Sequence, residues 1–89
     1  MKPPYLEVTF RHGRPLAAYL YLPRAPGDKC RRSDQVGGGL IVDYTESGKA
    51  IGVEITAPEK LDIAELNRVL ARIRAPVLTA DDIAPLRAA

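Results

Sequence analysis

The segment from Gly37 to Thr56 constrains the fold most strongly, because it carries the clearest β-hairpin signal in the chain. It reads GGGLIVDY, then TESG, then KAIGVEIT, so two β-branched runs flank a short polar loop that ends in glycine. A four-residue loop at residues 45–48 predicts the following facing pairs: Tyr44 with Lys49, Val42 with Ile51, and Leu40 with Val53. The sequence therefore predicts a two-stranded ribbon around which the remaining elements assemble.

The two faces of this ribbon differ in polarity. The face that carries the pairs above is apolar, as is needed for packing on a core. The opposite face carries mixed small, charged and apolar residues: Ile41, Asp43, Ala50, Gly52, Glu54 and Thr56. A slip of one residue would exchange the two sets, so the register is strongly specified. Gly48 is expected at positive φ, because glycine closes loops of this length without a Cβ clash.

The residues before the hairpin predict further strands. Tyr5–Phe10 and Leu16–Leu22 alternate as strands do, with a turn at residues 11–15 and loop residues at 24–28. Cys30–Val36 is polar and alternating, which predicts a short strand at an edge of the sheet or facing water.

A helix is predicted over residues 62–75. Asp62 can cap its start, with Glu65 completing a capping box, and Pro76 ends it. One helical stripe is apolar and needs a surface to cover: Ile63, Leu66, Val69, Leu70 and Ile73. The tail, residues 76–89, is expected to contain a short helical turn capped by Thr79.

These elements predict an α+β fold in a single domain over residues 1–89. A four- or five-stranded antiparallel β-meander occupies residues 5–56, and the C-terminal α-helix packs on one of its faces. The one cysteine excludes an internal disulfide, which is typical of a reducing compartment, and no run of about 18 apolar residues suggests a membrane span. We therefore expect a cytoplasmic protein with no membrane contact.

The stretch CRRSDQVGGGLIVDYTESGKAIGVEI, from Cys30 to Ile55, resembles the small bacterial family catalogued as domain of unknown function 2283. The family pattern has an L-Y-I-x-L strand, a polar strand that ends E-x-V-G-x-G, a V-I-V-D-Y strand, an acidic turn with glycine, and an I-V-G-I-E-I strand. Members usually carry an acidic link where this chain has the basic residues 11–15, and the helix from Asp62 exceeds the common core. The resemblance implies an antiparallel meander, no known enzyme activity, and an antitoxin-like role beside a small toxin as one alternative.

Three patterns are candidates for catalytic, metal-binding or phosphate-binding sites, and none meets the requirements of its chemistry. Cys30 has cationic neighbours, but a whole strand separates it from His12, the only histidine. The glycines at 37–39 precede a strand and not the helix that a phosphate loop requires. Asp43 and Glu54 have no histidine close in sequence. We predict no enzyme activity, no cofactor and no metal.

The remaining hypothesis is a small interaction module that self-associates through a sheet face or edge. The candidate partner surface comprises Tyr19, Tyr21, Arg31, Arg32, Ile41, Asp43 and Glu54. A homo-oligomer is the simplest form, and a different protein partner is the next. Nucleic-acid binding through the basic N-terminal half is a further alternative, although no RNA-binding motif is present and the isoelectric point of 8.9 falls short of the usual footprint.

Overall fold

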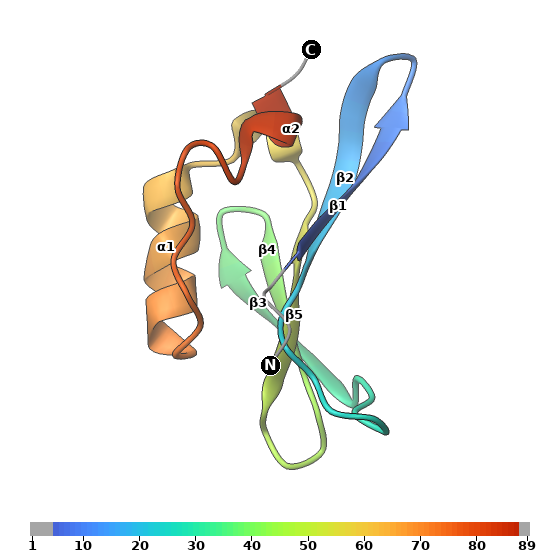
Figure 1. The fold of residues 1–89 in the computed structure, drawn as a ribbon, viewed down its shortest axis with the longest axis vertical. Helices are drawn as coiled ribbons and strands as arrows, with labels where there is room; N and C mark the ends of the chain where they lie inside the picture. Colours follow the sequence, from blue (N-terminus) through green and yellow to red (C-terminus); the bar gives the residue numbers. More distant parts are fainter. Residues whose placement is uncertain (1–4, 88–89) are drawn as a thin grey trace.

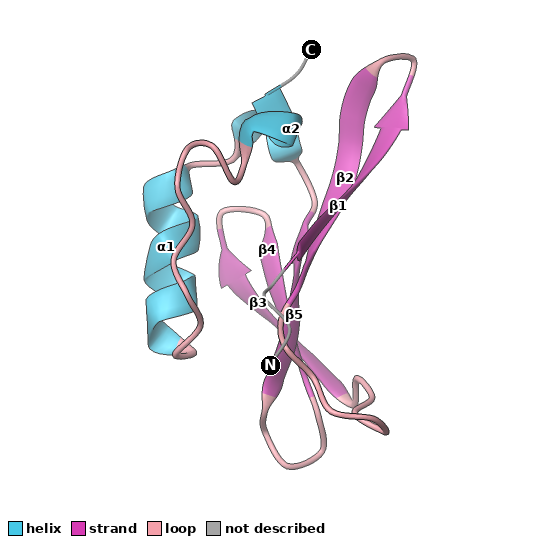
Figure 2. Cartoon of the chain, viewed as in Figure 1, coloured by secondary structure: helices cyan, strands magenta, loops and turns pink. Residues whose placement is uncertain are grey.

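The computed structural model describes residues 5–87 and consists of one antiparallel sheet with helices on one side (Figures 1 and 2). The elements in chain order are β1 (Tyr5–Arg11), β2 (Arg14–Tyr21), β3 (Arg32–Gly37), β4 (Leu40–Tyr44), β5 (Ala50–Ile55), the 3-10 turn η1 (Pro58–Lys60), α1 (Ile63–Arg72) and α2 (Ala84–Arg87). The α+β fold class and the antiparallel sheet expected from the sequence are confirmed.

The strand order is β1-β2-β5-β4-β3, so the sheet is not a meander with strands in chain order. The connection from Leu22 to Arg31 carries the chain to the far edge, and the β3-β4-β5 unit then folds back until β5 pairs with β2. This places β5 in the middle of the sheet, where Leu20 faces Val53. The polar strand β3 lies at an edge, as its sequence predicts.

The central hairpin forms as predicted, but its register is shifted. The Thr45 N–H donates to the Lys49 carbonyl oxygen at 2.9 Å, so these two residues close the loop, and Gly48 has a φ of 92°. The loop shifts the predicted pairing by one residue, so that Tyr44 faces Ala50 and not Lys49. A bulge at Ile51 shifts it by one more residue, so that Val42 faces Val53 and not Ile51. The total shift is two residues, which preserves the predicted faces because side chains alternate with period two.

The bulge has one further consequence for the predicted faces. Ala50, which was expected opposite the apolar face, instead faces Tyr44 and packs with it against the core. The displaced backbone at Ile51 keeps its hydrogen bonds, because its carbonyl oxygen accepts from the Leu22 N–H at 3.2 Å and from Arg24 Nη2 at 2.8 Å. Residues just after β2 therefore stabilise the irregularity in β5.

Helix α1 covers the apolar face of the sheet with the predicted stripe. Leu66, Val69 and Leu70 are buried, while Ile63 and Ile73 are partly buried against the same core. The buried core contains Ala18, Leu20, Leu22, Leu40, Val42, Val53, Ile55, Leu61, Leu66, Val69, Leu70, Ile83 and Leu86. Each buried leucine, isoleucine or valine in this core contributes about 1.5–3 kcal/mol, which is why the sheet needs the helix.

Helix α1 is shorter than the predicted helix at residues 62–75, and its start lacks the predicted capping box. Asp62 caps the first turn by accepting from the Ala64 N–H at 2.9 Å, but the Glu65 carboxylate lies against Gly38 and does not complete the capping box. At the other end the Ala75 N–H donates to the Leu70 carbonyl oxygen at 2.8 Å. Arg74, with a φ of 60°, occupies the left-handed position that glycine usually takes in this type of helix end.

The tail returns along α1 and completes the core. The Asn67 side chain donates to the Leu78 carbonyl oxygen at 2.9 Å and accepts from the Leu78 N–H at 2.8 Å. Thr79 then caps the predicted short turn, because its hydroxyl accepts from the Asp82 N–H at 3.3 Å and the Asp82 carboxylate accepts from the Thr79 N–H at 2.7 Å. The last residues of the predicted tail, 88–89, lie outside the described part.

Candidate functional site

The sheet face opposite α1 carries two rows of side chains that cross all five strands. In the order β1, β2, β5, β4, β3, one row is Tyr5, Tyr21, Gly52, Asp43 and Ser33, and the other is Glu7, Tyr19, Glu54, Ile41 and Gln35. We call these ten residues the tyrosine face. No described helix covers it, because the helices lie on the other side of the sheet (Figure 2).

Three tyrosines form a continuous aromatic cluster on this face. The rings of Tyr5 and Tyr21 stack with centroids 4.5 Å apart, and the ring of Tyr19 meets Tyr21 edge-on at 4.7 Å. The Arg24 guanidinium lies 5.5 Å from the centroid of the Tyr21 ring. Such pairs contribute about 0.5–1.5 kcal/mol beyond their buried area, so the ring contacts modestly stabilise this face.

A polar chain continues from this cluster to β3. The Tyr19 hydroxyl donates to Asp43 Oδ2 at 2.7 Å, and the Ser33 hydroxyl donates to Asp43 Oδ1 at 2.6 Å. Burial and the neighbouring carboxylate of Asp43 raise the pKa of Tyr19 well above its usual range. The Tyr19 side chain crosses β5 at Gly52, where the absence of a side chain leaves room for it. Tyr19 therefore acts as a neutral donor at ordinary pH.

The structure brings together five of the seven residues of the predicted partner surface. Tyr19, Tyr21, Ile41, Asp43 and Glu54 share the tyrosine face, as the alternation of their strands indicates. The other two, Arg31 and Arg32, lie outside this face, as the pairing of β3 with β4 shows.

Arg32 faces Tyr44 on the helix side of the sheet, with its guanidinium 4.6 Å from the ring centroid. Arg31 precedes β3 beside the β4–β5 turn. The charged groups of the tyrosine face itself are the carboxylates of Glu7, Asp43 and Glu54. Arg31 and Arg32 are thus separated from the other five residues of the predicted partner surface.

The two edges of the sheet differ in how they are protected. At the β3 edge, Val36 forms a bulge, and the charged residues Arg32 and Asp34 point to the helix side, with Arg32 Nε 3.6 Å from Asp34 Oδ2. Bulges and inward-pointing charges are devices that prevent pairing with another strand.

The β1 edge lacks such protection. Its seven residues, YLEVTFR, contain no proline or lysine, and the bulge beside it belongs to β2. Tyr5 is 58% exposed and Phe10 is 49% exposed. The structure therefore presents one guarded and one open edge, and the open edge carries exposed aromatic side chains.

The candidate chemical groups do not form a reaction centre. His12 lies in the turn between β1 and β2, whereas Cys30 precedes β3 at the opposite end of the sheet, 3.5 Å from the Ser33 hydroxyl (Figure 1). Gly38 and Gly39 form the β3–β4 turn and lead into a strand. Within residues 5–87, no three histidine, cysteine, aspartate or glutamate side chains are grouped so as to hold a metal ion.

Comparison with known proteins connects this sheet to a family. The family described as "Protein of unknown function (DUF2283)" matches residues 17–57, which confirms the resemblance seen in the sequence. The matched segment contains β3, β4, β5 and most of β2, whereas β1 and α1 lie outside it. No curated protein and no solved structure matches the chain. No helix within the described residues is both long and apolar enough to cross a membrane.

Proposed function

We propose that this protein, which carries a domain of the DUF2283 family at residues 17–57, is a non-enzymatic interaction module that dimerises by pairing β1 with β1 of a second copy. The single observation that carries the proposal is the difference between the two edges of the sheet. The β3 edge has a bulge and charged side chains that oppose pairing, whereas the β1 edge on the opposite side lacks them. Pairing of two such edges satisfies backbone groups and produces one continuous sheet across the dimer.

The sequence of β1 is complementary to itself when reversed. An antiparallel pair centred on Val8 places Leu6 opposite Phe10 of the second copy, and Tyr5 opposite its Arg11. Glu7 then faces Thr9, so no like charges oppose each other in this register. Leu6 and Val8 already pack against the core on the helix side, and pairing would extend that apolar surface across the two-fold axis.

Sedimentation velocity over a range of protein concentrations tests this proposal. We expect a reversible dimer for the wild-type protein, and we expect Phe10→Lys to weaken dimerisation by roughly tenfold or more, because lysine on an edge strand opposes pairing. Val77→Lys is the matched control, because Val77 is 59% exposed and lies outside β1. Amide exchange in residues 5–11 gives an independent readout, since it should slow as the dimer forms.

Several outcomes would reject the dimer. A wild-type protein that remains monomeric at high concentration excludes it, as does equal weakening by Phe10→Lys and Val77→Lys. The antitoxin-like alternative instead predicts a 1:1 complex with a toxin that protects the same β1 amides, and the nucleic-acid alternative predicts binding to single strands that weakens steeply with salt.

A further inference from the structure

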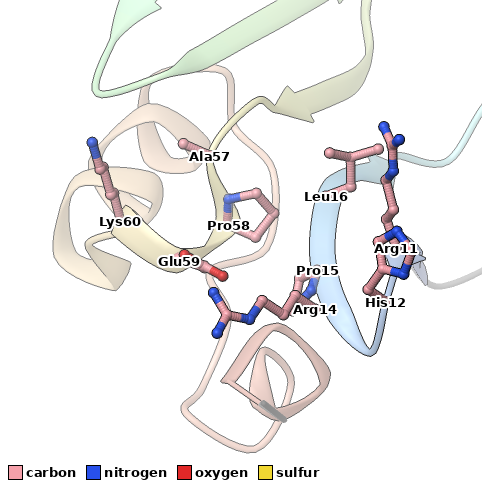
Figure 3. A pocket seen from close by; sticks show the side chains of 9 residues that line it. All are labelled: Arg11, His12, Arg14, Pro15, Leu16, Ala57, Pro58, Glu59 and Lys60. Atoms are coloured by element: carbon pink, nitrogen blue, oxygen red, sulfur yellow. The ribbon is translucent and has the colours of Figure 1, made fainter.

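A cleft lies between the β1–β2 turn and η1 (Figure 3). Its volume is about 380 Å³, within the range of small-molecule sites. Figure 3 shows Pro58 and Glu59 on one side, with Leu16, Pro15 and Arg14 on the other. The cleft is thus formed by two segments that are remote in sequence.

The lining combines an apolar floor with a basic rim. Pro15 and Pro58 are buried, and Leu16, displaced by the bulge in β2, leaves 52% of its surface exposed. The rim carries three permanent cations, Arg11, Arg14 and Lys60, together with His12 and the single carboxylate of Glu59. Cationic side chains therefore outnumber the one carboxylate beside this exposed apolar surface.

No ion pair among the described residues includes a cation of the rim, although the Arg14 side chain points toward Glu59 and that of Lys60 points away from it (Figure 3). The two ion pairs of the described residues join Arg32 with Asp34 and Lys49 with Asp28, at the other end of the sheet. An arginine guanidinium offers a planar set of donors that matches carboxylate and phosphate oxygens. The rim is therefore suited to an external oxyanion.

We propose that this cleft binds a small organic molecule that joins an oxyanion, either carboxylate or phosphate, to an apolar or aromatic body. The oxyanion pairs with the Arg14 guanidinium at the rim, and the body covers Leu16 and Pro58 on the floor. Neither group alone uses both parts of the lining. The cleft shares only Arg11 with β1, and its binding groups Arg14, Leu16 and Pro58 lie outside that strand, so the proposal does not depend on dimerisation.

Titrations followed by backbone amide chemical shifts at low salt test the site with four probes: adenosine monophosphate, 3-phenylpropionate, its neutral amide, and inorganic phosphate. We expect at least one organic anion to saturate, with shifts confined to residues 11–16 and 57–60, and to bind roughly tenfold more tightly than inorganic phosphate and the neutral amide. Tighter binding of the nucleotide identifies phosphate as the oxyanion, and tighter binding of phenylpropionate identifies carboxylate.

Two variants separate the parts of the lining. Arg14→Gln should weaken the organic anion at least about fivefold, whereas Arg68→Gln on α1, an exposed arginine outside the cleft, should leave it unchanged. Leu16→Ser should remove the advantage of the organic anion over inorganic phosphate. Absence of saturation by both organic anions, shifts elsewhere, equal binding of all anions, or equal effects of the two arginine variants would overturn the proposal.

Discussion

Tyr19 on β2 donates a 2.7 Å hydrogen bond to Asp43 on β4, although β5 lies between these two strands. The side chain can cross because Gly52, which faces Asp43 and Tyr21 in the sheet, has no Cβ. This contact links the two halves of the sheet on the face that α1 does not cover.

Gly52→Ala should disrupt this link. A Cβ at position 52 would overlap the Tyr19 hydroxyl and ring, so the ring must move and the bond to Asp43 is lost. We expect a decrease of about 1–3 kcal/mol in the free energy of unfolding, measured by urea denaturation. In a Tyr19→Ala background the same substitution should cost much less, because the space is free. An equal cost in both backgrounds would contradict the explanation.

The ionisation of Tyr19 should report the same contact. Burial, and secondly Asp43, raise the pKa of Tyr19, so the neutral form is favoured in the folded protein. The resulting stabilisation is fully present below the ordinary tyrosine pKa of about 10 and is lost as the pH rises through the higher pKa of the folded state. In a titration of tyrosinate absorbance, Tyr19→Phe should remove the step at highest pH. Retention of that step would show that another tyrosine is responsible.

A substitution at Gly48 tests the cost of backbone strain alone, because a new Cβ there would contact no other residue. The φ of Gly48 is 92°, and a Cβ built there meets no atom within 4 Å, so only backbone strain opposes a substitution. Gly48→Val should lower the free energy of unfolding by about 1–2 kcal/mol, because a β-branched residue is strained at positive φ. Gly48→Asn should cost less, since asparagine tolerates this region. Equal thermal midpoints for wild type and Gly48→Val would contradict the prediction.

Arg74 is a position where glycine should stabilise the protein. Its φ of 60° lies in the left-handed region, and the hydrogen bond from Ala75 to Leu70 fixes that conformation. Arg74→Gly should raise the free energy of unfolding by about 0.5–1 kcal/mol. The control, Arg68→Gly, lies at an exposed position in the interior of α1 and should lower it by about 1 kcal/mol. Changes of the same sign in both variants would rule out this account of the helix end.

Local patterns predicted the faces of the elements better than their pairing. The alternation around Val42 and Val53 and the stripe on α1 correctly identified the core, because one side of each element must be buried. The bulge at Ile51 could not be read from the sequence, since the Arg24 and Leu22 donors that satisfy it come from a distant segment. The position of β5 beside β2 likewise depends on contacts between segments remote in sequence.

For the candidate surfaces, too, the sequence predicted which residues share a face but not which side chains are in contact. Alternation placed Tyr19 and Asp43 on one face, but their direct contact required the unforeseen strand order. Arg32 was also predicted to belong to this surface. Its register opposite Tyr44 instead directs it to the helix side of the sheet. The cleft at Arg14 and Pro58 had no signal in the sequence, because it joins a turn to a segment more than forty residues later.

The strand order also determines how the chain must assemble. The β1–β2 and β3–β4–β5 units each close through short turns, but Ala18 and Ile55, which face each other where the units join, are 37 positions apart. The entropy lost on closing a loop grows with its length, so the two units can form early and independently, while the β2–β5 seam closes late. We therefore expect the pairing of β2 with β5, in the middle of the finished sheet, to form last and to limit the rate of folding.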